Sequence, residues 1–128
     1  MRPEAGSPAA WMRFARSDLA IARGGPDPEI LLEGLCFHAQ QAAEKAIKAV
    51  LVHSGIPASR THSIEHLVGL LPASIERLPV LTQAAGLTQY AVEFRYPSDV
   101  ESVTDEEHAE AVRIAEEVIS WAKGLIES

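Results

Sequence analysis

The feature that most restricts the folds open to this chain is the spacing of its apolar residues. Apolar positions recur every three or four residues along nearly the whole sequence, whereas the alternation typical of half-buried strands is almost absent. Glycine and proline stand between the periodic stretches, where helices commonly end. The pattern therefore predicts an all-α protein.

Composition and charge narrow the class further. The chain has 128 residues, 47% of them hydrophobic and 23% charged, which is typical of a folded domain, and we assign residues 1–128 to one helical domain. Cys36 is the only cysteine and no apolar run could span a bilayer, so we expect a cytoplasmic protein without membrane contact. The net charge of −7 arises after Pro97, because acidic and basic side chains balance before it. This charge disfavours a generally basic surface for nucleic acid.

Capping signals set the ends of the first two expected helices. Ser7-Pro8 is a typical helix start, and Gly24-Gly25-Pro26 ends the first helix. Asp27-Pro28 repeats the start signal, and the second helix then continues to Ser54 without a clear break. The expected buried positions are Trp11, Phe14, Ala15, Leu19 and Ala22 on the first helix, and Leu32, Leu35, Ala39, Ala42, Ala46 and Val50 on the second.

Three further helices are expected. A short one follows Thr61 or Ser63, a fourth runs from Pro79 to the Arg95-Tyr96-Pro97 segment, and the last begins at the capping box of Thr104-Asp105-Glu106-Glu107. The chain should therefore form an up-and-down bundle of about five helices, four long and one short. The buried stripe expected on the last helix consists of Val112, Ala115, Val118, Ile119, Ala122 and Ile126.

Side chains that carry chemistry are few. Zinc and di-iron motifs are absent, and His62 and His66 share helical spacing but lack an evident third ligand, so we expect no metal and no cofactor. Cys36 lies near the apolar side of the second helix, which predicts a buried, unreactive thiol. A polar stripe remains on the second helix, and periodicity alone favours a solvated face. Its members are His38, Gln41, Glu44, Lys45 and Lys48.

The segment that contains this stripe resembles a known signature. Residues 36–49, CFHAQQAAEKAIKA, are similar to the signature of the HEPN domain family, the helical domains found in higher eukaryotes and prokaryotes. The resemblance covers nearly the whole chain. It extends to Trp11 with Ala15 and Asp18-Leu19, to His62-Ser63-Ile64-Glu65-His66-Leu67, and to Tyr90 followed by Arg95-Tyr96-Pro97.

The resemblance implies a helical bundle that usually dimerises and is often encoded beside a minimal nucleotidyltransferase, as in toxin–antitoxin modules. Some relatives are metal-independent ribonucleases in which a histidine follows an arginine after four to six residues. Here Tyr96 and Pro97 follow Arg95 and the next histidine is His108, so that motif is not intact. Arg60 and His66 have the spacing, but Arg60 precedes the short helix, and we interpret this match as coincidence.

The resemblance therefore implies a non-catalytic module that binds a nucleotide such as ATP, or a nucleotidyltransferase, between the second and fourth helices. Lysine and arginine would hold phosphates there and Tyr96 would stack on a base. The alternatives are an ion pair from Glu44 to Arg95, a ribonuclease toxin and a purely structural adaptor. RNA binding is not favoured. We expect a homodimer, because the alanine-rich second helix would leave apolar surface uncovered. The expected groove residues are His38, Gln41, Glu44, Lys45, Lys48, Arg95 and Tyr96, with His62 and His66 as secondary candidates.

Overall fold

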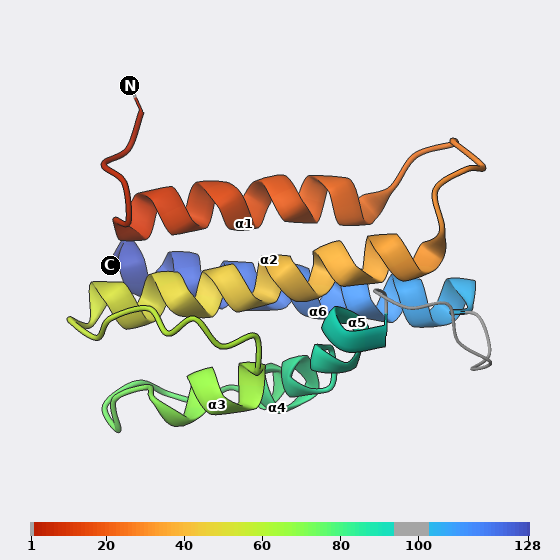
Figure 1. Ribbon diagram of the computed structural model, residues 1–128. Coiled ribbons are helices and arrows are strands. Elements are labelled where there is room, and N and C mark those ends of the chain that lie inside the picture. The colour runs from red at the N-terminus through yellow and green to blue at the C-terminus, as the bar shows by residue number, and fades with distance from the viewer. Residues whose placement is uncertain (1, 94–102) are drawn as a thin grey trace.

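All regular structure in the described part of the chain is helical. The computed structural model describes residues 2–93 and 103–128 (Figure 1). None of the described helices is long and apolar enough to cross a membrane. The expectation of an all-α bundle is confirmed. The helices are α1 (Pro8–Arg23), α2 (Leu32–His53), α3 (Ile64–Gly69), α4 (Pro79–Ala85), α5 (Thr88–Glu93) and α6 (Asp105–Ile126).

Helix α2 is the central element. Helices α1 and α6 pack along it, and the short helices lie on the side of α2 opposite α1 (Figure 1). Small side chains permit this close approach, because five alanines of α2 are fully buried: Ala39, Ala42, Ala43, Ala46 and Ala49. The expectation that α2 leaves apolar surface uncovered is therefore wrong. The exposed large hydrophobic residues of the described chain lie elsewhere: Phe14, Ile21, Ile30, Leu31 and Leu70.

The expected caps fix the ends of the long outer helices. The hydroxyl of Ser7 accepts from the backbone N–H of Ala10 at 3.2 Å, and α1 ends at Gly24, whose φ of 77° favours glycine. At the start of α6, Thr104 and Glu107 exchange side-chain-to-backbone hydrogen bonds of 3.1 and 3.0 Å. Both predictions of helix starts are confirmed.

The start of α2 differs from the prediction. The helix begins at Leu32, because the signal at Asp27 forms a separate turn. A carboxylate oxygen of Asp27 accepts from the N–H of Glu29 at 2.9 Å, and its carbonyl accepts from Ile30 at 3.3 Å. Such aspartate turns compete with helix capping for the same side chain.

The expected fourth helix is two helices. The N–H of Gly86 bonds the carbonyl of Gln83 at 3.1 Å and that of Leu87 bonds Ala84 at 2.9 Å, so the last turn of α4 tightens and the chain is redirected into α5. Of these two helices, α5 packs closely on α2, whereas α4 packs on α3 and α6. The bundle thus has three long and three short helices among the described residues.

The buried faces agree in part with the prediction. On α1, Ala15, Leu19 and Ala22 are buried as expected, but Phe14 is 58% exposed while Met12 and Asp18 are buried. On α6 the stripe is wider than predicted. Its buried members are Ala111, Ile114, Ala115, Val118, Ile119, Trp121 and Ala122, whereas Val112 and Ile126 are half-buried.

Candidate functional site

The polar stripe of α2 does not form a solvated face. Glu44 is only 2% exposed, and Gln40 and Lys48 are also buried. The stripe faces the interior because Asp18 from α1 and His62 from the segment before α3 supply polar partners there. The solvated interpretation that periodicity favoured is therefore wrong for Glu44 and Lys48.

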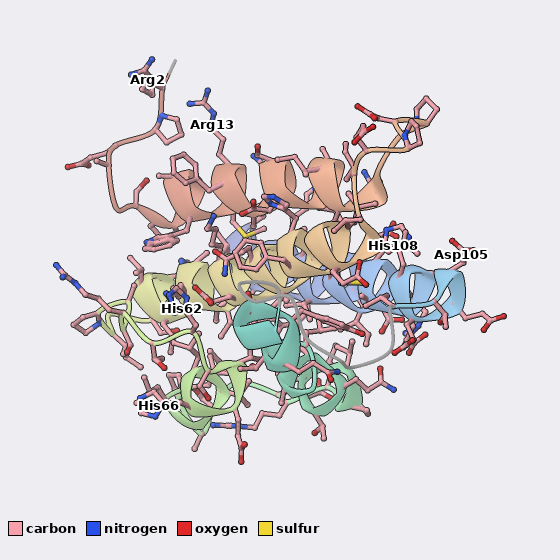
Figure 2. The ribbon with its side chains drawn as sticks, turned by 45° about the vertical axis from the view of Figure 1, so that its right-hand side comes forward. Arg2, Arg13, His62, His66, Asp105 and His108 are labelled. Carbon is pink, nitrogen blue, oxygen red and sulfur yellow. The ribbon has the colours of Figure 1, made fainter. Side chains whose placement is uncertain are left out.

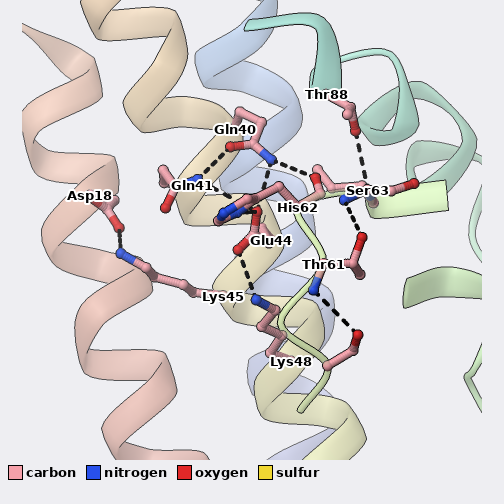
Figure 3. A network of polar contacts seen from close by, with 12 residues as sticks. Asp18, Gln40, Gln41, Glu44, Lys45, Lys48, Thr61, His62, Ser63 and Thr88 are labelled. Atoms are coloured by element: carbon pink, nitrogen blue, oxygen red, sulfur yellow. Dashed lines mark hydrogen bonds and ion pairs between the residues drawn. The ribbon is translucent and has the colours of Figure 1, made fainter. Parts of the chain in front are cut away.

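The carboxylate of Glu44 lies at the centre of this network (Figure 3). One oxygen accepts from the Lys48 ammonium at 2.9 Å. The other accepts from Gln40 at 3.1 Å and, more weakly, from Gln41 at 3.5 Å. Nδ1 of His62 lies 3.0 Å from the same oxygen, and it donates because a carboxylate oxygen only accepts. With this many donors the buried charge of Glu44 is fully satisfied.

A second cluster joins α1 to α2. The Asp18 carboxylate contacts Nδ1 of His38 at 3.0 Å and accepts from the Lys45 ammonium at 2.6 Å. Asp18 is buried, whereas His38 and Lys45 are half-buried at the edge of the bundle. These contacts tie the middle of α1 to the middle of α2.

Both lysines of the stripe also face aromatic rings of α1. The Lys45 ammonium lies 5.9 Å from the centre of the Phe14 ring, and the Lys48 ammonium lies 5.6 Å from that of Trp11. Each ammonium thus has a carboxylate and an aromatic face as neighbours. A phosphate group that reached Lys48 would first have to displace a buried carboxylate.

The structure brings together most of the expected groove. His62 joins it, but His66 lies apart on the exposed side of α3, where its N–H donates to Ser63 (Figure 2). Arg95 and Tyr96, and with them the ion pair expected between Glu44 and Arg95, lie outside the described residues. In the described ranges no three His, Cys, Asp or Glu side chains are arranged to hold a metal ion. The residues brought together are His38, Gln41, Glu44, Lys45 and Lys48.

Two members of the network were not among the expected site residues. Asp18 stands on the apolar stripe of α1, and an acidic residue at such a position signals a buried partner. Gln40 lies one turn before Glu44, where their side chains meet on the helix surface. Both signals are readable in the sequence. The partner of Gln40 lies on the same helix, whereas the partners of Asp18 come from α2 and cannot be read from α1 alone.

The imidazole of His108 and the thiol of Cys36 both have structural roles. Nε2 of His108 lies 2.6 Å from the carbonyl oxygen of Ala22, to which it donates near the end of α1. Burial raises the pKa of the Cys36 thiol from 9.0 to about 11, with smaller contributions from Glu107 and Glu33. The expectation of a buried thiol is confirmed.

Comparison with known proteins identifies the fold family. The family profile described as "HEPN domain" matches residues 9–125, nearly the whole chain. The chain belongs to the HEPN family. The HEPN signature segment is thus the part of α2 that carries the buried network.

Two solved structures are similar to this HEPN chain along its whole length. TT1696 from Thermus thermophilus has a TM-score of 0.79 and 25% sequence identity, with 94% of this chain and 98% of that chain covered. ST0689, described as an archaeal HEPN homologue, has a TM-score of 0.70 and 30% identity over the same shares. Comparison with curated protein sequences gives no match.

Proposed function

We propose that this HEPN protein is a non-catalytic interaction module that acts as a homodimer with a minimal nucleotidyltransferase, in a toxin–antitoxin-like system. The observation that carries the proposal is the mutual pairing of the signature residues. Glu44 and Lys48 neutralise each other inside the protomer, and Lys45 is paired with Asp18. Side chains paired in this way stabilise a scaffold and are not free to stabilise charge on a reacting phosphate.

His108 is held by a contact with the end of α1. It is the first histidine after Arg95 and therefore the one that an arginine–histidine motif at Arg95 would need. Its Nε2 is engaged by the carbonyl of Ala22 at 2.6 Å. The contact makes Nε2 the donor and leaves Nδ1 as the nitrogen that can accept a proton, so a ribonuclease site that used His108 would have to form beside the end of α1.

The half-buried edge of the network is the proposed contact surface. His38, Gln41 and Lys45 are half-buried on α2. We propose that these three residues, together with Arg95 and Tyr96, contact the partner or a nucleotide such as ATP. The proposal predicts a minimal nucleotidyltransferase encoded beside this chain, and the test is co-expression of the two proteins followed by size-exclusion chromatography. We expect co-elution that Arg95→Ala and Tyr96→Ala abolish and the control Arg60→Ala preserves. Separate elution of the wild-type proteins would contradict the proposal.

The proposed dimer rests on exposed apolar side chains around the connection between α1 and α2. Ile21, Ile30 and Leu31 are exposed there, and water-exposed aliphatic residues close in sequence favour association. Light scattering should give twice the protomer mass of 13.8 kDa. The double variant Ile21→Ser/Leu31→Ser should be monomeric, whereas Leu70→Ser at the residue that follows α3 should remain dimeric. A wild-type monomer at micromolar concentration would reject the dimer.

One contact favours the ribonuclease alternative. The His62 side chain is 54% exposed while buried Glu44 holds its Nδ1, which is how carboxylates orient catalytic imidazoles. The exposed residue Arg60 lies two positions earlier. RNA cleavage in the presence of EDTA, abolished by His62→Gln but not by the control His53→Gln, would establish this alternative and overturn the non-catalytic proposal.

A further inference from the structure

A basic cavity lies at the end of the bundle where the segment before α1 meets the last turns of α6. Its volume is about 630 Å³. Four cationic side chains and one carboxylate line it: Arg2, Arg13, Arg16 and Lys123, with Glu127. Arg2 and Arg13 lie on the same side of the N-terminal half of α1 (Figure 2). The segment before α1, α1 itself and the distant last turn of α6 thus bring cations to one cavity.

The side chains of these four cations have no partner within the described part of the protein. In the described ranges none of these side chains forms a hydrogen bond or an ion pair, and Arg60 is the one other cation of which this is true. The remaining described cations are all engaged: Arg23 with Glu116, Arg77 with backbone carbonyls at the end of α3, Arg113 with Glu110 and Glu117, Lys45 with Asp18, and Lys48 with Glu44. Of the five unpaired cations among residues 2–93 and 103–128, four therefore line one cavity, in a protein whose net charge is −7.

The arginines on α1 have no local reason to be adjacent. Arg13 and Arg16 are three residues apart, so their side chains are neighbours on the helix and repel each other. Lys123 lies in the last turn of α6, where a cation also stabilises the helix end, but the arginine pair gains nothing of this kind. A bound anion would remove the repulsion and accept several charge-assisted hydrogen bonds.

A second, apolar pocket of about 600 Å³ adjoins the cavity, because Arg2, Pro3 and Arg13 line both. Trp11 and Phe14 belong to its lining. The Phe14 ring is largely exposed, and an exposed ring offers a surface on which a planar base can stack. A ligand with a linked row of phosphates and an aromatic base would fit both pockets at once.

We propose that the basic cavity is a binding site for a run of linked phosphate groups, such as the polyphosphate of a nucleotide. Arg2, Arg13, Arg16 and Lys123 contact the phosphates, and Phe14 contacts the base where one is present. The four cations lie apart from the edge of the α2 network, whereas the Phe14 ring also faces Lys45 of that edge. The phosphate site does not depend on the proposed partner or on the dimer.

Calorimetric titration of the full chain with sodium triphosphate at low ionic strength tests the proposal. Arg13→Gln and Arg16→Gln should each weaken binding about tenfold, because each removes a bidentate phosphate contact while glutamine keeps a similar helix propensity. The control Arg60→Gln removes the same charge from an exposed site outside the cavity and should leave the affinity unchanged. Equal weakening by Arg60→Gln, or no binding at millimolar triphosphate, overturns the proposal.

Titration with ATP distinguishes the sources of the phosphate chain. ATP that binds more tightly than triphosphate, with the difference lost in Phe14→Ala, identifies a nucleotide, whereas equal affinities identify inorganic polyphosphate. ATP binding that is lost in Arg95→Ala and retained in Arg13→Gln places the nucleotide at the α2 groove and overturns this site, while the proposed function stands. Binding of single-stranded RNA alone, without triphosphate or ATP, also overturns it.

Discussion

Replacement of Glu44 by glutamine tests the view that the HEPN signature is a buried structural network. The substitution keeps the size of the side chain and one acceptor oxygen for Gln40 and His62. It turns the other oxygen into an amide that faces the Lys48 ammonium, so two donors oppose each other where a 2.9 Å ion pair stood. Loss of one member of a buried ion pair typically costs about 3–5 kcal/mol. The Trp11 ring still faces the ammonium and partly offsets the loss, so we expect the free energy of unfolding to fall by about 3 kcal/mol, the lower end of this range.

The assay is urea unfolding followed by circular dichroism, with the midpoint lowered and the slope unchanged. The variant Lys48→Met, made in both the wild-type and the Glu44→Gln background, gives a more discriminating test. In the wild-type background it leaves the Glu44 charge buried without its partner and should destabilise the protein by a similar amount. In the Glu44→Gln background it removes the unpaired ammonium and should restore about 1–2 kcal/mol. A loss below about 1 kcal/mol in Glu44→Gln, or a Lys48→Met effect of the same sign in both backgrounds, would refute the reasoning.

Three further predictions concern single groups. Burial raises the pKa of Cys36 to about 11, so the neutral thiol contributes stability that is complete below the thiol pKa of the unfolded chain and declines as the pH rises towards 11. At pH 8 a thiol reagent should therefore react with Cys36 only after the protein unfolds. Rapid reaction with the native protein would contradict this prediction. The hydrogen bond from Arg113 lowers the pKa of exposed Glu110. The stability that this contact contributes is therefore present above the pKa of Glu110 in the unfolded chain and is lost as the pH falls through the lowered value. An NMR titration of Arg113→Gln should show a higher Glu110 pKa than in the wild type, and an unchanged pKa would exclude the contact. Thr104→Ala should lower the free energy of unfolding by about 1 kcal/mol, measured by urea unfolding, because it removes the capping box with Glu107.

Local signals were sufficient for the helix ends that use local chemistry. Ser7 and Thr104 cap the helices that their sequence positions predict. Asp27 was misjudged because the same carboxylate can cap a helix or close a turn, and the choice depends on where α2 must start to pack. The break at Gly86 was also missed, because the apolar spacing of α4 continues into α5 and hides the change of direction.

The site was harder to predict because its partners come from distant segments. The stripe that contains Glu44 has the helical period of a solvated face, and nothing in α2 alone shows that His62 and Asp18 cover it. The family resemblance selected residues that the network brings together, but it gave no sign of their mutual pairing. The basic cavity could not be predicted at all, since Arg2 and Lys123 are separated by almost the entire chain.

The five fully buried alanines of α2 restrict how the bundle can change. An alanine has no side-chain rotamers, so these five positions of the central helix enter the core without side-chain entropy loss. For the same reason its neighbours meet a nearly rigid surface, and an added methyl or larger group cannot be absorbed by a rotamer change there. It has to displace α1 or α6 as a whole. In a saturation library, tolerance at these positions should therefore fall off abruptly with side-chain volume, with few variants of intermediate stability.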